Sequence, residues 1–286
     1  MASVREIRRR IRSVGATAQI TRAMQMVASS KMRKAQQAAI NGQPFARLLY
    51  RIQREVTRNT EVEHPLLVRR EVRTRGIVLV AADKGLCGAL NGNVFRVAAQ
   101  YDPASTVFVT AGKRAAQFVA RTGRRLLAEF EYTDTPTFAQ ARAIASFARD
   151  LFLKREVDEV DIVATRFVNT LTQVAVSMEF LPIGEITRLK IPGLEKVEQE
   201  IDDSECVFEP SAAGVLDFLL GHYLNFIVYQ VLLNAKASEQ SARMVAMKNA
   251  TDNAERLIQD LSLEGNKLRQ GNITQELLEI AGGQAE

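Results

Sequence analysis

The stretch ASEQSARMVAMKNATDNA, residues 237–254, decides the fold because it belongs to a long heptad repeat. Its seam positions alternate three and four residues apart, which is the spacing of a helix that packs lengthwise against another helix. The seam consists of Ala237, Gln240, Met244, Met247, Thr251, Ala254, Ile258, Leu261, Gly265 and Leu268. Leucines are the usual residues at such positions, so the sequence raises the question of why this seam is small, flexible and polar.

The C-terminal helix is predicted to be very long. From Val215 to Leu263 the chain has no proline and a single glycine, Gly221, and the helical pattern continues to about Ile280. A helix of about seventy residues, at roughly 1.5 Å per residue, spans on the order of 100 Å. Because a compact domain of this chain's size is narrower than that, we expect the helix to project.

A second heptad repeat occupies the N-terminus. Its seam is Val4, Ile7, Ile11, Val14, Ala18, Thr21, Gln25, Ala28, Met32, Ala35 and Ala39. Gly42 and Pro44 interrupt the pattern, and we expect a helix that kinks there and runs on to about Arg58. Residues 1–58 carry 13 Lys and Arg against 2 Asp and Glu, whereas residues 210–286 carry 6 against 9. The two repeats and their opposite net charges predict an antiparallel coiled coil.

The middle of the chain has a different pattern. Short β-branched runs at 76–82 and 105–111 are each followed by a glycine-bearing loop and a helical stretch, and residues 138–153 form an amphipathic pattern. Two further runs, 159–168 and 171–183, are predicted strands joined by a tight turn at Asn169–Thr170. This order predicts a Rossmann-like α/β domain with a mostly parallel sheet. We therefore divide the chain into an N-terminal helix (1–58), a globular α/β domain (59–209) and a C-terminal helix (210–286).

Composition excludes several functional classes. The chain of 286 residues has 47% apolar and 25% charged residues, which is ordinary for a soluble globular protein. It has no run of eighteen apolar residues and no signal sequence at its start, so we expect a cytoplasmic protein. Cys87 and Cys206 lie far apart, and His64 and His222 have no His or Cys within helical reach. We therefore expect no disulfide framework, no metal site, no cofactor and no histidine-based catalysis.

Two local motifs leave alternatives open. The loop AADKGLCGALNGN (81–93) follows a strand and carries three glycines, so it could hold a phosphate, although it matches no established phosphate-loop pattern. Its alternative is a tight turn into a helix. The basic run REIRRRIR (5–12) could bind nucleic acid, but it has no aromatic residue for stacking, and its seam favours a helical partner. Two other classes thus remain: a nucleotide-binding α/β enzyme with a coiled-coil appendage, and a nucleic-acid-binding coiled coil.

Four stretches resemble one known family. REIRRRIRSVGATAQITRAMQMVASSKMRKAQ (5–36), ASEQSARMVAMKNATDNA (237–254) and NITQELLEI (272–280) are similar to the terminal helices of the gamma subunits of F-type ATP synthases. ADKGLCGALNGN (82–93) is similar to the family's Ser-Asp-Arg-Gly-Leu-Cys-Gly loop. The resemblance covers the whole chain and implies a non-catalytic central-stalk rotor that couples proton-driven rotation to ATP synthesis and hydrolysis on other chains. It also answers the question of the seam, because two helices in a narrow bore must pack closely and must slide past several partners without interlocking.

The resemblance also implies partners and contact residues. The partners are the alpha and beta subunits of the catalytic hexamer, the epsilon subunit and the membrane rotor ring, with no nucleic acid. The expected location is peripheral, at the cytoplasmic face of a bacterial cell membrane. The residues implied to contact beta subunits are Met24, Arg269, Gln270 and Thr274. Those implied to lie at the foot, near epsilon and the rotor ring, are Asp83, Lys84, Gly85, Asn91 and Cys206.

The chain departs from the family pattern in a few places. Ala82 and Lys84 stand where the family usually has Ser and Arg, which keeps the positive charge. Gly265 and Gly271 interrupt the upper shaft helix, where each glycine costs about 1 kcal/mol relative to alanine. The inserted cysteine pair of the chloroplast versions is absent, so we expect no thiol regulation.

Overall fold

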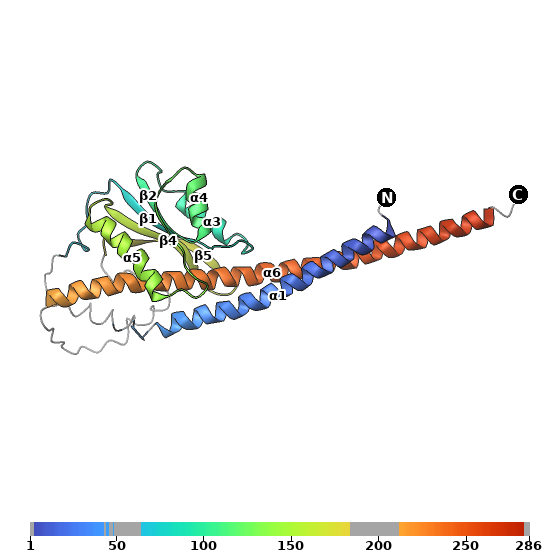
Figure 1. Cartoon of the computed structure of the whole chain (residues 1–286), viewed down its shortest axis with the longest axis horizontal. Helices are drawn as coiled ribbons and strands as arrows, with labels where there is room; N and C mark the ends of the chain where they lie inside the picture. The colour runs from blue at the N-terminus through green and yellow to red at the C-terminus, as the bar shows by residue number, and fades with distance from the viewer. Residues whose placement is uncertain (1–2, 43, 46–47, 49–63, 184–211, 283–286) are drawn as a thin grey trace. The chain divides into compact units, whose positions relative to one another are not determined.

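The computed structural model describes residues 3–42, 44–45, 48, 64–183 and 212–282 (Figure 1). They form, in chain order, α1 (Val4–Asn41), β1 (Arg75–Val80), α3 (Leu90–Ala98), β2 (Thr106–Ala111), α4 (Lys113–Arg121), β3 (Arg125–Phe130), α5 (Phe138–Leu153), β4 (Glu159–Phe167), β5 (Gln173–Leu181) and α6 (Ala212–Gly282). The chain divides into two compact units. One consists of Met1–Ala28 with Arg243–Glu286, and the other of Ser29–Ala242, so α1 and α6 contribute to both.

The larger unit is built on a five-stranded sheet with the order β3-β2-β1-β4-β5. The first four strands are parallel, and β5 is antiparallel to β4. β1 and β2 are buried along almost their whole length, as strands of a parallel sheet covered on both faces are. The strand order reverses between β1 and β4. In open α/β sheets, ligands bind outside the carboxyl ends of the strands at such a point, so the loop after β1 occupies the position where a ligand would be sought.

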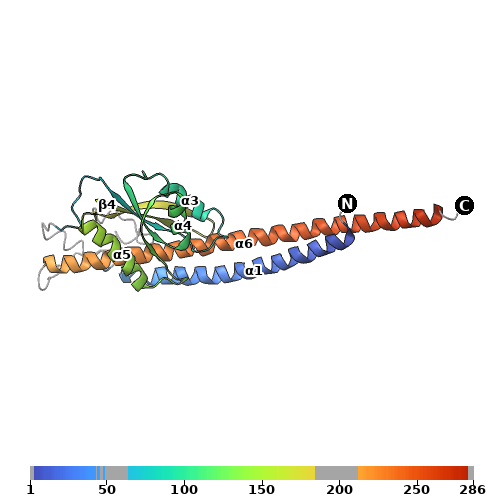
Figure 2. The same ribbon diagram turned by 45° about the horizontal axis from the view of Figure 1, so that its top comes forward.

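Helices cover both faces of this sheet (Figures 1 and 2). α5 and residues 219–235 of α6 pack with Val78 and Val80 on one face, whereas α3 and α4 pack with Ile77 and Leu79 on the other. α5 begins with a capping box: the Thr137 hydroxyl accepts from the Gln140 amide, and the Gln140 side chain accepts from the Thr137 amide. The α/β layers therefore enclose the first part of α6 as a core helix.

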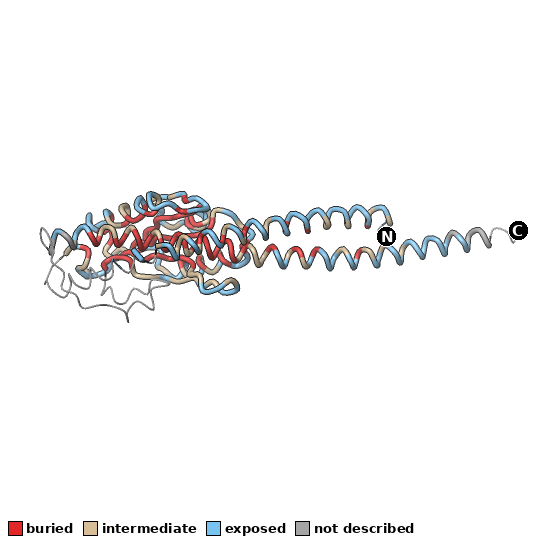
Figure 3. Tube along the Cα trace, turned by 90° about the horizontal axis from the view of Figure 1, so that it is seen from below, coloured by how far each residue is buried: buried red, intermediate tan, exposed pale blue. Residues whose placement is uncertain are grey.

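Burial changes along α6 (Figure 3). Residues 219–241 are almost continuously buried, whereas exposed positions dominate from Glu255 onward. By length and composition alone, a window within Asp217–Gln275 is apolar enough to cross a membrane, although the sequence has no unbroken apolar run of that length. Because 67% of that window is buried inside the protein, its apolar character is that of a core helix.

The structure confirms the mixed α/β class, the mostly parallel sheet and the long C-terminal helix. The predicted helix at 138–153 matches α5, and the four predicted strands match β1, β2, β4 and β5 to within two residues at each end. The hairpin turn is longer than predicted, because Asn169 and Thr172 exchange backbone hydrogen bonds beyond the end of β4. β3 was not predicted. It is an edge strand whose residues are exposed or half-buried, so its sequence lacks a hydrophobic signal.

The N-terminal helix is confirmed as far as Asn41. Gly42 forms a turn, and Pro44, Phe45 and Leu48 are again helical, as the interrupted repeat predicts. The predicted continuation over 49–58 lies outside the described residues. The three-part division at residues 58 and 209 and the projection of the coiled coil stay predictions.

Candidate functional site

The helices of the smaller unit run antiparallel, with their small seam residues facing each other. A Cβ placed on Gly265 would lie 3.3 Å from Ile7, and one placed on Gly15 would lie 4.0 Å from Ile258. Contacts thus move toward the N-terminus of α6 as they move toward the C-terminus of α1. The buried seam residues of this unit are Ile7, Ala18, Thr21, Ala28, Met247, Thr251, Ala254 and Leu261. All eight occupy predicted heptad positions.

A polar contact lies inside this seam. The Thr21 and Thr251 hydroxyl oxygens are 2.6 Å apart, and both side chains are buried. The Thr21 hydroxyl also lies 3.0 Å from the Ala18 carbonyl oxygen, and the Thr251 hydroxyl lies 3.0 Å from the Met247 carbonyl oxygen. Each hydroxyl carries one proton, so one of the two donates across the seam while the other donates to a backbone carbonyl of its own helix.

The outer surface of the helix pair is charged and exposed. Arg22 pairs with Glu255 across the two helices, and Arg10 pairs with Glu6 one turn away on α1. Arg33 is exposed and makes no ion pair with any residue that the structure describes. The predicted surplus of positive charge on α1 is therefore only partly neutralised by α6.

The residues predicted to contact beta subunits lie on this pair. Arg269, Gln270 and Thr274 are exposed on the last turns of α6, and the Thr274 hydroxyl donates to the Gln270 carbonyl at 2.9 Å. Met24 on α1 is half-buried. The three C-terminal residues share a short exposed segment and are accessible to another chain. Whether they contact one stays a prediction.

The other predicted contact residues that the structure describes lie in the loop after β1 and at the start of α3. Some of them face outward, and others form hydrogen bonds within the loop. Lys84 is exposed, and Gly85 is half-buried. Asp83 instead accepts from the Lys113 amide at 3.0 Å, at the start of α4. The Asn91 carbonyl oxygen accepts from the Ala82 amide at 3.2 Å. Asp83 and Asn91 thus shape the loop from within, and Cys206 lies outside the described residues.

A buried charge cluster that the sequence did not predict lies beneath this loop. Lys236 on α6 is 1% exposed, and its amine lies 3.0 Å from Glu239, 3.8 Å from Asp83 and 3.9 Å from Asp134. The amine also lies 4.5 Å above the centre of the Tyr132 ring. The available signal was a lysine within the buried run of α6, one turn before an acid. Helix periodicity alone did not distinguish it from an exposed residue.

The protonation of the surrounding groups reflects this cluster. The hydrogen bond from Lys31 lowers the pKa of Asp134, and the charges of Lys31, Lys236 and Lys84 act in the same direction. Burial raises the pKa of Tyr132 well above its usual value, and three nearby carboxylates raise it further. Tyr132 therefore stays protonated, and its hydroxyl donates to the Ala81 carbonyl at 3.0 Å.

The backbone beside the cluster leaves little space. Gly112, just after β2, has a φ of 96°, and a Cβ there would lie 2.1 Å from the Ala81 carbonyl oxygen. Lys236 and Tyr132 lie at the carboxyl end of β1, where they contact Asp83 and the Ala81 carbonyl. Gly88, in this loop, and Gly112 thus have the positive φ angles that tight turns require.

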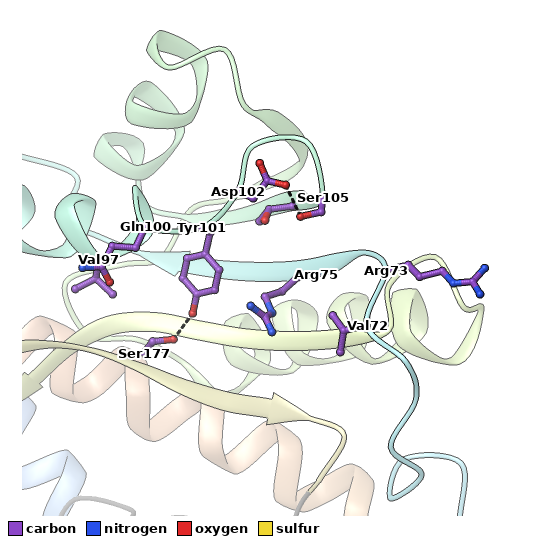
Figure 4. Close-up of a pocket in the computed structure, with 10 residues that line it drawn as sticks. Val72, Arg73, Arg75, Val97, Gln100, Tyr101, Asp102, Ser105 and Ser177 are labelled. Carbon is purple, nitrogen blue, oxygen red and sulfur yellow. Dashed lines mark hydrogen bonds between the residues drawn. The ribbon is translucent and has the colours of Figure 1, made fainter.

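A cavity of about 460 Å³ lies at the opposite, amino-terminal edge of the sheet (Figure 4). Tyr101 crosses it and bonds to Asp161 at 2.8 Å and to Ser177 at 2.5 Å. Arg75 forms hydrogen bonds to Glu159 and lies 3.8 Å from Asp161. Burial raises the pKa of Asp161 to about 6 and that of Tyr101 to about 12. Arg75, the cation of this network, thus has two acidic partners within the sheet.

These features define a class of protein. The α/β unit encloses the first part of a long helix, and the outer surface of the helix pair is largely exposed. Within the described ranges, no group of three or more His, Cys, Asp or Glu is placed to hold a metal ion. The fold thus combines a mixed α/β unit with an antiparallel pair of long helices.

Comparison with known proteins identifies the family. The family model described as ATP synthase matches residues 3–285. The ATP synthase gamma chain of Opitutus terrae is 46% identical and that of Methylacidiphilum infernorum 43% identical, each over 99% of this chain and at least 98% of the relative. The chain belongs to the ATP synthase gamma chain family, whose members are non-catalytic central-stalk subunits.

Solved structures agree with this family. A chain from the central stalk and c-ring of the Tetrahymena thermophila mitochondrial ATP synthase aligns with a TM-score of 0.60 and 26% identity, over 81% of this chain and 99% of that one. A chain from the rotor of the Euglena gracilis mitochondrial ATP synthase aligns with a TM-score of 0.67 at 20% identity, over 94% and 98% of the two chains, and shows the shared fold.

Proposed function

We propose that this chain turns inside an alpha/beta hexamer and couples proton flow through a membrane rotor ring to ATP synthesis and hydrolysis. Its place would be peripheral, on the cytoplasmic face of a bacterial cell membrane, with the epsilon subunit beside it. Full-length similarity to gamma chains at 46% identity supports this proposal. The observation that carries it is the narrow seam of the helix pair, in which buried Thr21 faces Thr251.

The seam fits a rotor for a physical reason. Small residues allow two helix axes to approach more closely than leucine layers do, and a thinner pair needs a narrower bore. Charged, mobile side chains on the outside exchange partners at little cost, because isolated exposed ion pairs contribute about 0–1 kcal/mol. A shaft with such a surface can leave one contact and form the next without a deep energy minimum.

The exposure of the residues suggested by the family resemblance supports specific contacts. Arg269, Gln270 and Thr274 would meet beta subunits, because they are exposed together near the end of α6. Arginine is enriched among residues that dominate interface energies. Met24 would meet them lower on the shaft. At the foot, Lys84 would be the outward contact of the loop after β1.

The other foot residues take supporting roles in this proposal. Asp83 and Asn91 hold the loop through their hydrogen bonds to backbone amides. Gly85 lies between the exposed residues of the loop. Cys206 stays assigned to the foot by resemblance alone. In this proposal Lys84 contacts partner chains, and Asp83 holds the loop in shape from within.

Co-expression with the alpha and beta chains of the same organism tests the function. We expect a stable complex that hydrolyses ATP, whereas the purified chain alone should bind no ATP at micromolar concentrations in calorimetry. Micromolar ATP binding by the isolated chain, together with no complex, would favour a nucleotide-binding enzyme with a coiled-coil appendage. DNA binding that persists at physiological salt would favour the nucleic-acid class instead.

A matched pair of variants tests the contact residues. Arg269→Ala should weaken association with the alpha and beta chains by on the order of tenfold, as the loss of an arginine anchor does. Arg256→Ala removes another exposed arginine of α6 that lies outside the predicted contacts, and it should leave association unchanged. Equal effects of the two variants would show that only the total charge of the helix matters.

A further inference from the structure

Lys236 is the one charged residue among the largest fully buried side chains of the described chain. Glu239, one turn away on α6 and 3.0 Å from the amine, would alone neutralise it. The amine nevertheless also faces two carboxylates from other segments: Asp83, in the loop after β1, and Asp134, in the loop after β3. A buried ammonium is retained only with such partners, because burying a charge without them is very unfavourable.

Asp83 is held at both of its oxygens. One accepts from the Lys113 amide at 3.0 Å, and the other lies 3.8 Å from the Lys236 amine. Its side chain is 26% exposed and so faces mainly inward. Lys236 therefore joins α6 to the base of the loop at the carboxyl ends of the parallel strands.

The tip of the same loop faces outward in an unusual conformation. Leu86 is 64% exposed and has a φ of 62°, which is rare for a leucine. Gly88 also has a positive φ of 59°. A strained backbone of this kind persists only where the surrounding structure determines it, and the anchored base at Asp83 supplies such a constraint.

We propose that Lys236 is the positioning residue that fixes the loop of residues 81–89 to α6, so that loop and helix move as one body. The inference deepens the proposed function, because this loop is the outward contact assigned to the foot. The ammonium attracts the Asp83 carboxylate and keeps it over the helix. Through Asp134, which also bonds to Lys31, the same ammonium is linked to α1.

Hydrogen exchange on the isolated full-length chain tests this role. The amides of Ala82 and Lys113 are protected by bonds to Asn91 and Asp83, so they report opening of the loop base. Lys236→Met keeps the length of the side chain and removes its charge. We expect these amides to exchange faster by on the order of tenfold, since the loss of a charge-assisted contact changes a local opening constant by at least that factor.

Arg75→Met is the matched control. It removes another cation with two acidic partners from the same sheet, at the opposite edge. It should leave exchange in the loop unchanged. Two results for Lys236→Met would overturn the proposal: unchanged loop exchange, or an equal acceleration across the whole unit, which would reveal general stabilisation only.

A second variant keeps the test decisive if Lys236→Met does not fold. Asp83→Asn retains the acceptor for the Lys113 amide and removes only the charge that faces the ammonium. It should accelerate loop exchange in the same way. Where both variants fold, their effects should not add in the double variant, because they remove the same attraction. Additive effects, or an Asp83→Asn loop that exchanges like wild type, would overturn the proposal.

The consequence for rotation is measured separately. In the complex with alpha, beta and ring subunits, Lys236→Met should lower proton pumping per ATP hydrolysed, because the foot no longer follows the shaft rigidly. If the wild-type chain forms no such complex, the proposed function fails while the exchange result on the isolated chain still stands. If the complex forms and loop exchange does not change, only the role of Lys236 fails.

Discussion

Replacing two glycines of α6 by alanine should give different results, although the sequence treats them alike. Alanine is favoured over glycine in a helix interior by about 1 kcal/mol. Gly271 is exposed, and a Cβ there would meet no atom within 4 Å. Gly271→Ala should therefore stabilise the end of α6 by about 1 kcal/mol, which slows local amide exchange by about fivefold.

Gly265→Ala should lack this gain. A Cβ at this position would lie 3.3 Å from Ile7 Cγ2, which is tighter than ordinary van der Waals contact. Ile7 is 1% exposed and β-branched, so its methyl group has little room to move. Overpacking of this kind costs about 1–3 kcal/mol. The strain should cancel or exceed the helix gain, and the two variants should differ by about 1–3 kcal/mol.

Exchange of amides along α6 in the full-length chain measures both effects, because it reports local opening of the helix near each glycine. If Gly265→Ala slows exchange as much as Gly271→Ala does, the two helices are not in close contact at Ile7. If Gly271→Ala does not slow exchange, the glycine does not lower the stability of the last turns of α6. Either result would refute the reasoning.

Further predictions concern the buried threonine pair, the Asp161 carboxyl group and the basic face of α1. Thr251→Val should destabilise the helix pair by about 1 kcal/mol in urea unfolding, because the hydrogen bond across the seam is lost and the buried Thr21 hydroxyl remains. Adding Thr21→Val should restore most of the loss, because it removes that buried hydroxyl. The pKa of Asp161 is about 6 in the folded chain and 3.8 ordinarily, so between these pH values the folded chain holds a proton that the unfolded chain releases. The free energy of unfolding should therefore fall by about 3 kcal/mol from pH 4 to above pH 6. Asp161→Asn should abolish this pH dependence in urea titrations. Arg22→Glu with Arg33→Glu should leave helical content unchanged but alter ATP hydrolysis by the complex, most at low salt; wild-type rates at low salt would show that this basic face is merely solvated.

The helices were predictable because their signals are periodic and long. The seam positions Thr21, Met247 and Thr251 are buried as the heptads require, and α5 begins and ends where its amphipathic pattern does. β3 escaped prediction because an exposed edge strand places few apolar residues in the core. Propensity and pattern report burial, so an element with little burial gives little signal.

The proposed contact residues have no pattern of their own for a related reason. Exposed residues such as Arg269 and Lys84 carry no pattern, and the sequence assigned them by resemblance. Lys236 was missed because its burial depends on segments more than a hundred residues away, around Asp83 and Asp134. No local window contains that information, and a lysine beside Glu239 on a helix is usually part of a solvated face.

The α/β unit has the strand order of sheets that bind ligands at the carboxyl ends of their strands. In this chain a lysine from α6 lies at that edge. Where a nucleotide or substrate would be sought, beside the loop after β1, the chain places Lys236 from its own α6. The ammonium meets the carboxylates of that edge as a bound cation would. A sheet occupied in this way holds a helix firmly, and firm attachment of α6 is the property that a rotor needs from its foot. Because Lys236 occupies this position, its substitution should test the attachment of the loop to α6 most directly.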